Sequence, residues 1–191
     1  MVLSVKMAFL KARLAEFRDD VRGSIMVETV ITLPLLIWAM VATYEFFEIH
    51  RYQSVRDKAS YTIADMLSRE QLPVNTTYID NVQLLYDQIT NDDGVNQVRV
   101  SVIEYAADTD TYETQWSEVR GVGSLGAHAI GEFPDGHEKL PIMSNGEPVV
   151  LVESVSTYVP MLDIVFSNDI PIETRVFTSL RFSPNLYCSD C

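Results

Sequence analysis

A short acidic stretch is the first place in this sequence where residue types and spacing could support chemistry. It contains Glu132, Asp135, His137 and Glu138. Carboxylates and imidazoles are common metal ligands, but this spacing matches no helix or strand geometry that would aim them at one ion. The sequence also lacks the signatures of phosphate-binding loops, serine hydrolases, zinc proteases and dinucleotide sites. It therefore predicts a protein that is not an enzyme and that holds no cofactor and no metal.

Cys188 and Cys191 form a Cys-x-x-Cys pair and are the two cysteines of the sequence. In an oxidising compartment, such a pair closes a tight local disulfide. A redox motif of this spacing belongs at a helix start in a thioredoxin-like unit, and the residues before Cys188 predict no such unit. We therefore expect a local disulfide, and a reduced tail and a metal site are the alternatives.

The third candidate is a carboxylate inside an apolar run. From Ile25 to Phe47 the sequence has 23 residues, of which two, Glu28 and Glu45, are formally charged. A helix of this length reaches about 35 Å, which is enough to cross a bilayer core of ~30 Å. A charge deep in the hydrocarbon costs roughly 2.5–3.5 kcal/mol, so Glu28 needs a reason. Three explanations are open. Glu28 lies at a helix N-terminus, where the helix dipole favours a negative charge, or its carboxyl group is protonated or reaches the membrane interface, or it has a functional role.

Charge is distributed unevenly around this run. Residues 1–23 carry a net charge of +2, from five basic and three acidic residues, and the rest of the sequence carries −15. Basic residues before a span and an acidic domain after it place the N-terminus in the cytoplasm. A secretory signal peptide fits poorly, because the run is too long and no small-residue cleavage site follows it. The acidic balance also argues against nucleic acid as a partner.

Gly23, followed five residues later by Glu28 at the head of an apolar helix, resembles the class III signal of type IV prepilins and pseudopilins. The wider sequence resembles the TadE/TadG-like minor pseudopilins of the Tad (Flp) pilus assembly system, through Phe17-Arg18, Arg22-Gly23, Val27-Glu28 and Leu33-Pro34-Leu35-Leu36. The resemblance is strong over residues 17–47 and looser beyond them. It implies that a membrane-embedded aspartyl protease cuts after Gly23 and leaves Ser24 as the new N-terminus. Thr29 departs from the pattern of Tad prepilins, which usually carry an aromatic residue there, so an uncut anchor is the alternative.

The resemblance implies a single-pass protein of the bacterial inner membrane with a periplasmic C-terminal domain. Its partners would be other minor subunits of the Tad pilus, the major pilin and a prepilin peptidase. If Ser24 becomes a free amine, Glu28 can pair with it across one helical turn or with the amine of an adjacent subunit. In a low dielectric, such a pair would set direction and register rather than add net stability.

The residues after the apolar run are expected to connect it to a domain. Apolar residues recur at three- and four-residue steps after the span, at Ile49, Tyr52, Val55, Ala59, Ile63 and Met66. This period predicts one long helix that continues to about Glu70, with Pro34 as the place where it would bend. A second helix is predicted from Tyr78 to Thr90, with Thr77 and Asp80 as its capping pair and a turn over residues 91–94.

Beyond residue 94 the hydrophobic period changes to two, which is typical of strands. The alternation predicts strands around Val98–Val102, Tyr112–Ser117, Val149–Tyr158 and Ile172–Phe182. In the second of these, Tyr112, Thr114 and Trp116 are expected on one face. The stretch from Arg120 to Pro148 holds six of the eight glycines, and we expect a short helix near Ser124–Ile130 within it.

These elements predict an α+β protein in which a transmembrane helix extends into a head with a second helix on a four-stranded antiparallel sheet, a pilin-like plan. The expected parts are a basic leader (1–23), a transmembrane helix (24–47), its amphipathic extension (48–72) and a periplasmic domain (73–191). The expected function is that of a minor pseudopilin-like component of Tad/Flp type IV pilus assembly, acting through helix packing and head contacts. The alternatives are a pseudopilin of a general secretion system, a membrane-anchored periplasmic binding or sensor domain, and an anchored hydrolase.

Overall fold

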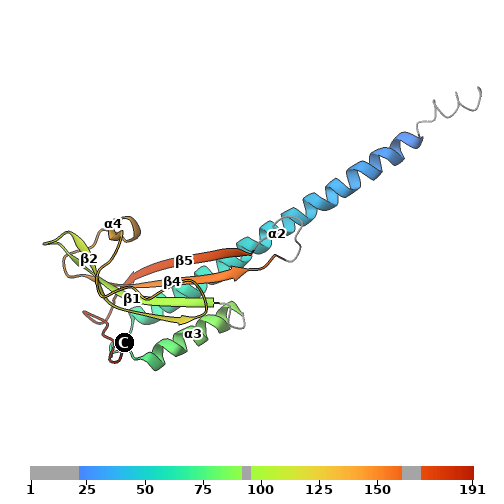
Figure 1. Ribbon diagram of the computed structural model, residues 1–191. Helices are drawn as coiled ribbons and strands as arrows, with labels where there is room; N and C mark the ends of the chain where they lie inside the picture. The colour runs from blue at the N-terminus through green and yellow to red at the C-terminus, as the bar shows by residue number, and fades with distance from the viewer. Residues whose placement is uncertain (1–21, 92–95, 161–168) are drawn as a thin grey trace, which may run out of the picture. The chain divides into compact units, whose positions relative to one another are not determined.

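A computed structural model of the chain describes residues 22–91, 96–160 and 169–191. Its elements are α2 (Arg22–Ser68), α3 (Thr76–Thr90), β1 (Asn96–Ala106), β2 (Thr111–Gly121), β3 (Gly131–Glu132), α4 (Gly136–Lys139), β4 (Pro148–Tyr158) and β5 (Ile170–Ser179), shown in Figure 1. The chain divides into two compact units, Met1–Phe46 and Phe47–Cys191. The predicted α+β class is confirmed. Most of the predicted basic leader lies outside the described residues.

The described part of the first unit is the N-terminal half of α2. Among the described helices, α2 is the one that is long and apolar enough to cross a membrane. Its apolar side chains are solvent-exposed, with Val30 at 70%, Leu35 at 63% and Leu36 at 65%. Pro34 lies inside this helix, where its missing N–H leaves one carbonyl without its usual intrahelical donor. The predicted long apolar helix at the N-terminus is confirmed.

The second unit is built on an antiparallel sheet in the order β3-β2-β1-β4-β5. The prediction of four strands was wrong, because β3 pairs with β2 at Glu113 and Thr114 and adds a fifth. The predicted helix near Ser124–Ile130 was also wrong. This segment instead runs as a strap across the sheet, bonded to the side chains of β1 and β2, and the four-residue helix α4 follows it.

One face of the sheet carries the main hydrophobic core. The C-terminal part of α2 and α3 pack on this face, and α4 lies on the other side of the sheet (Figure 1). The buried side chains of this core include Ala59, Ile63, Leu67, Val82, Tyr86, Val98, Val100, Val102, Val150, Val152 and Val176. Full burial of an aliphatic side chain contributes roughly 1.5–3 kcal/mol, so this face provides most of the stabilisation. The smaller cluster on the opposite face includes Ile103, Phe133, Leu140 and Leu151.

A β-bulge separates Trp116 from Tyr112, which the sequence pattern had placed on one face. The register between β1 and β2 shifts between Val102 and Ile103. Because one extra residue of β2 is inserted there, the alternation of its side chains reverses. Trp116 therefore joins the core under the helices, and Tyr112 joins the cluster on the opposite face.

Buried hydroxyl groups fix α2 and α3 on the sheet. Ser60 on α2 and Thr174 on β5 lie 2.7 Å apart through their oxygens, and Ser154 on β4 lies 2.7 Å from the same Thr174 oxygen. The hydroxyl of Tyr86 on α3 completes the chain at 2.7 Å from Ser154. Since an unpaired buried hydroxyl is costly, this network favours one position of each helix along the strands.

Both ends of α3 differ in detail from the prediction. Its N-cap is Asn75, whose side-chain oxygen accepts from the Tyr78 N–H at 2.8 Å, and not the predicted pair of Thr77 and Asp80. Asn91 caps the C-terminus in the left-handed region, at φ 56°, which asparagine tolerates well. The rest of the predicted turn, residues 92–94, lies outside the described residues. β5 ends at Ser179, so Phe182 lies beyond the strand that was predicted to contain it.

Three glutamates stand side by side at the hairpin end of the sheet, and they generate a prediction. Glu104 is directly opposite Glu113, which is in turn opposite Glu132. Like charges in direct cross-strand positions are destabilising. Glu113→Gln should therefore raise the free energy of unfolding of the full-length protein by about 0.5 kcal/mol, measured by urea unfolding. The gain should shrink in about 1 M salt, where the Debye length is roughly 3 Å.

Glu173→Gln is the matched control, because Glu173 is an exposed glutamate on β5, the opposite edge strand, where it stands opposite Val155. It should give no comparable gain, because Glu173 has no like charge directly opposite it. An equal gain in both variants would show that the effect comes from net charge and not from the cross-strand row.

Candidate functional site

Gly23 and Glu28 lie on the exposed surface of α2, in the first unit. A Cβ atom added to Gly23 would meet nothing within 4 Å. Ser24 lies in the same helix, four residues before Glu28 and therefore on the same helical face. This spacing keeps the local pairing of a Ser24 amine with Glu28 geometrically open.

Hydroxyl groups in the apolar part of α2 are satisfied inside the helix. The Thr29 hydroxyl donates to the Ile25 carbonyl, and the Thr43 hydroxyl donates to the Ala39 carbonyl, both at 2.8 Å. Thr32 does the same one turn after Glu28. A hydrocarbon environment requires polar groups to bond internally, and these threonines meet that requirement without any outside partner.

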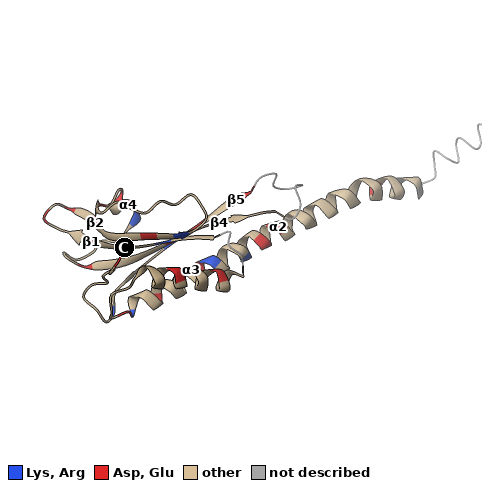
Figure 2. Cartoon of the chain, turned by 60° about the horizontal axis from the view of Figure 1, so that its bottom comes forward, with Lys and Arg blue, Asp and Glu red and all other residues tan. Residues whose placement is uncertain are grey.

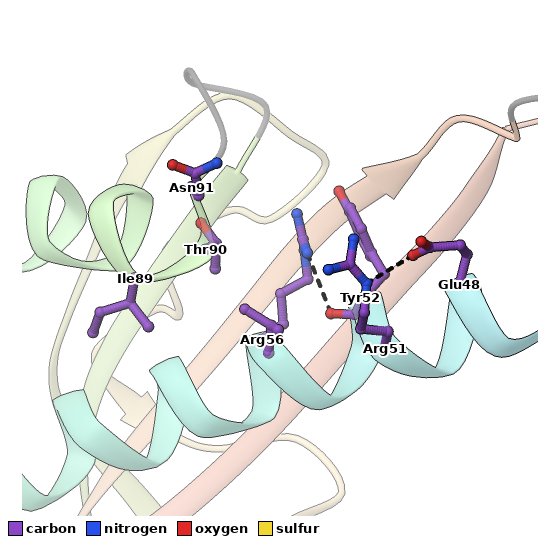
Figure 3. Close-up of a pocket in the computed structure, with 8 residues that line it drawn as sticks. Glu48, Arg51, Tyr52, Arg56, Ile89, Thr90 and Asn91 are labelled. Atoms are coloured by element: carbon purple, nitrogen blue, oxygen red, sulfur yellow. Dashed lines mark hydrogen bonds and ion pairs between the residues drawn. The ribbon is translucent and has the colours of Figure 1, made fainter.

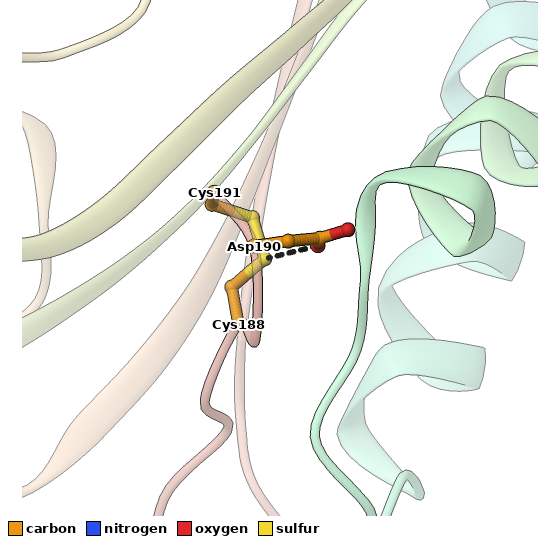
Figure 4. Close-up of side chains that lie close together, drawn as sticks. All are labelled: Cys188, Asp190 and Cys191. Carbon is orange, nitrogen blue, oxygen red and sulfur yellow. Dashed lines mark hydrogen bonds between the residues drawn. A yellow bond between two sulfur atoms is a disulfide. The ribbon is translucent and has the colours of Figure 1, made fainter.

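Cys188 and Cys191 form a disulfide, with their Cα atoms 5.6 Å apart (Figure 4). Asp190 lies between them and points toward the start of α3, and one of its carboxylate oxygens lies 3.9 Å from Cys188 Sγ. Its two carboxylate oxygens accept from the N–H of Thr76 at 2.8 Å and from the hydroxyl of Thr76 at 2.9 Å. Asp190 thereby adds a second cap to the N-terminus of α3, whose free amides and dipole favour a negative charge.

The same three residues form the one group of potential metal ligands gathered within 4.8 Å in the described part of the chain. While the disulfide is closed, its sulfurs are not available as thiolate ligands. In the acidic stretch, His137 and Asp135 instead bond to other residues. His137 lies 2.9 Å from the Asp110 carbonyl, and Asp135 pairs with Lys139 at 3.0 Å. Both residues border a cavity of about 240 Å³ that Glu132 and Glu138 also line.

A buried ion cluster lies on the sheet face opposite the helices, and the sequence pattern did not reveal it. Glu153 on β4 is 5% exposed and stands between Arg99 on β1 and Arg175 on β5 in the strand register. Arg99 Nε donates to Glu153 at 2.8 Å and Arg175 Nε at 2.9 Å. His128 from the strap reaches the same carboxylate at 3.2 Å. Basic and acidic residues meet in the middle of the sheet in Figure 2.

The cluster controls the ionisation of Glu153. Burial raises the pKa of this carboxyl, but the hydrogen bond from His128, the charge and hydrogen bond of Arg99 and the hydrogen bond of Arg175 outweigh it. Together they lower the pKa of Glu153 to about 2. A surface cavity of about 260 Å³ borders both arginines and Glu153. The cluster ties the strap to the sheet, because Arg99 also donates to the Gly126 carbonyl at 2.7 Å.

Another cavity, of about 370 Å³, lies where α2 passes the C-terminal end of α3 (Figure 3). Arg56 is 1% exposed there, donates to the Tyr52 carbonyl at 3.2 Å and stacks on the Tyr52 ring. Burial lowers the pKa of Arg56, while its contacts with Tyr52 raise it. Arg51 pairs with Glu48 at 2.8 Å on the rim. The C-terminus of a helix favours nearby cations. We therefore interpret this cavity as a charged contact between α2 and the C-terminal end of α3.

The Glu153 cluster generates a pH-dependent prediction. Its folded-state pKa lies below the ordinary value of 4.5, so ionised Glu153 stabilises the fold above pH 4.5 and loses this effect as the pH falls toward 2. Glu153→Gln should lower the free energy of unfolding by about 3 kcal/mol at pH 7, because it leaves buried charge unpaired. The difference from wild type should shrink between pH 4.5 and pH 2 in urea unfolding.

Glu173→Gln is the matched control, because Glu173 is an exposed glutamate that borders the same cavity. It should change the stability by less than about 0.5 kcal/mol at either pH. A loss for Glu153→Gln that stays the same down to pH 2 would contradict the assigned pKa and its cause.

No protein-family model, characterised protein or solved structure matches this chain.

Proposed function

We propose that this chain is a membrane-anchored, minor pseudopilin-like subunit that resembles the TadE/TadG-like proteins of Tad (Flp) pilus assembly. In this proposal α2 is anchored in the bacterial inner membrane over residues 24–47, and the unit Phe47–Cys191 is a periplasmic head. Its role is structural rather than catalytic, and it acts by helix packing in the bilayer and by head contacts with other pilus subunits. A long helix that continues into an α+β head is the pilin-like plan.

The observation that carries the proposal is the two-part character of α2. Its N-terminal half exposes large apolar side chains and satisfies its own hydroxyl groups. Its C-terminal half contributes Ala59, Ile63 and Leu67 to the core of the head. A soluble protein rarely exposes so much contiguous apolar surface, whereas a lipid bilayer covers it at no cost.

Glu28 has a specific task in this proposal. In a bundle of anchors, its carboxylate accepts the Ser24 amine of the same or an adjacent subunit and so fixes the axial register. The disulfide between Cys188 and Cys191 supports a head in an oxidising compartment such as the periplasm. The role of Glu28 and the disulfide bear on the proposal independently of each other.

A second candidate function is a membrane-anchored binding or sensor domain that belongs to no filament. The cavity of about 260 Å³ beside Arg99 and Arg175 favours it, because exposed guanidinium groups bind carboxylates and phosphates. Arg99 already uses Nε and both Nη atoms on Glu153 and Gly126. Arg175 is more exposed, but its Nε is also bonded to Glu153. We therefore rank this candidate second.

Processing at Gly23 gives the first prediction of the proposal. Co-expressed with a Tad prepilin peptidase, the protein should be cut so that N-terminal sequencing starts at Ser24. Gly23→Val should block the cut, because a small residue is needed for the protease to reach the backbone. Gly126→Val is the matched control, since a Cβ there also meets nothing within 4 Å, and it should be processed normally. An intact N-terminus in the wild type would favour the uncut anchor.

Assembly gives the second prediction. Glu28→Leu should insert into the membrane as wild type does, because it removes a charge that costs roughly 2.5–3.5 kcal/mol in hydrocarbon. It should nevertheless reduce cross-linking to co-expressed pilus subunits about tenfold or more, because the loss of Glu28 leaves the Ser24 amine as an unpaired charge in the bundle and removes the contact that fixes the register. Glu48→Gln, just beyond the apolar run, is the control and should cross-link normally. Equal cross-linking by both variants would remove Glu28 from the mechanism.

A further inference from the structure

We infer that the Cys188–Cys191 disulfide is a redox latch that holds Asp190 on α3, and that a dithiol reductant opens it. The inference does not rest on the proposed function, because it uses residues 74–78, 116 and 186–191. The segment that the latch controls crosses the connection between α2 and α3. Opening the latch would loosen the first turn of α3.

The segment around the disulfide is docked by contacts that lie ahead of the ring and within it. Ahead of the ring, Leu186 is buried and its carbonyl accepts from the Trp116 indole at 2.7 Å. Val74 donates to the Tyr187 carbonyl and accepts from the Ser189 N–H, both at 2.9 Å. Within the ring, Asp190 makes the two bonds to Thr76. Asp190 is thus the residue through which the ring reaches α3.

The contacts of Asp190 with Thr76 depend on whether the disulfide is closed or reduced. The disulfide joins residues three apart, so it restricts the backbone that carries Asp190 to few conformations. In the reduced protein, residues 188–191 can adopt many conformations, and this conformational entropy is lost each time Asp190 binds Thr76. Reduction therefore leaves the Leu186 anchor in place and weakens the second cap of α3. The first cap, from Asn75 to the Tyr78 N–H, remains in both states.

The two sulfur atoms differ in how easily a thiolate can reach them, and this decides which sulfur is attacked first. Cys191 is exposed, whereas Cys188 is partly buried and its sulfur lies 3.9 Å from an Asp190 oxygen that repels an incoming thiolate. A thiolate of the dithiol attacks Cys191 Sγ, the Cys188–Cys191 bond breaks, and Cys188 leaves as a thiolate. The second thiol of the reductant then displaces Cys191. The protein gains two electrons and two protons, and the dithiol becomes a disulfide.

The experiment is a cycle of amide hydrogen exchange on the full-length protein in detergent, oxidised or reduced with excess dithiothreitol. Reduction of the wild type should speed exchange at Thr76 and its neighbours about fivefold, the factor that corresponds to about 1 kcal/mol of cap energy. Oxidised Asp190→Ala should show the same acceleration. Reduction of Asp190→Ala should then add less than about twofold, because the latch no longer has a residue to hold.

Asp108→Ala, in the hairpin turn, is the control variant and should respond to reduction as the wild type does. Amides in the C-terminal half of α3 should be unchanged throughout. Three results would overturn the latch. They are an unchanged wild type on reduction, an equal response to reduction in wild type and Asp190→Ala, and a faster exchange that extends over the whole head.

Discussion

The structure depends on one constraint, which is that a single helix must serve two environments. The N-terminal half of α2 presents apolar side chains outward on all sides, and the C-terminal half presents a narrow apolar stripe to a sheet. Each half is unstable without its own cover, because exposed apolar surface costs about 25 cal/mol per Å². The sheet supplies one cover, and in the proposed function the bilayer supplies the other. The head is therefore built on a helix whose other half is the proposed anchor.

The sheet places polar groups as well as apolar ones. Strand register brings Arg99, Glu153 and Arg175 into one row, and this row ties the glycine-rich strap to the face that the helices leave uncovered. On the helical face, the hydroxyl chain from Ser60 to Tyr86 fixes the position of both helices. The disulfide segment then crosses from the core to the start of α3. Each of these devices joins elements that are distant in sequence, so each limits how the head can move.

Local periodicity was enough to predict α2, α3 and the four long strands, because each of them carries a regular hydrophobic pattern over five residues or more. The pattern failed where a single residue decides the outcome. The bulge in β2 reverses the side-chain alternation and moves Trp116 and Tyr112 to opposite faces. The segment 124–130 forms no helix, because its backbone bonds to strand side chains that no local pattern reveals. The Glu153 cluster was missed for the same reason, since its other members lie 22 to 54 residues from Glu153 in the sequence and meet it only through the fold. Gly23, Glu28 and the cysteine pair could be singled out as candidates from the sequence because their spacing is local.

Cysteine-accessibility scanning along α2 in native membrane vesicles tests the two-environment helix most directly. Single cysteines at residues 30, 33, 36 and 40 should resist a water-soluble maleimide until detergent dissolves the bilayer. Cysteines at the exposed positions Ser54, Lys58 and Tyr61 should react at once from the side of the vesicle that carries the head. If the positions between 30 and 40 react as fast as Ser54 without detergent, α2 is not covered by lipid, and the account of this chain as an anchored subunit is contradicted.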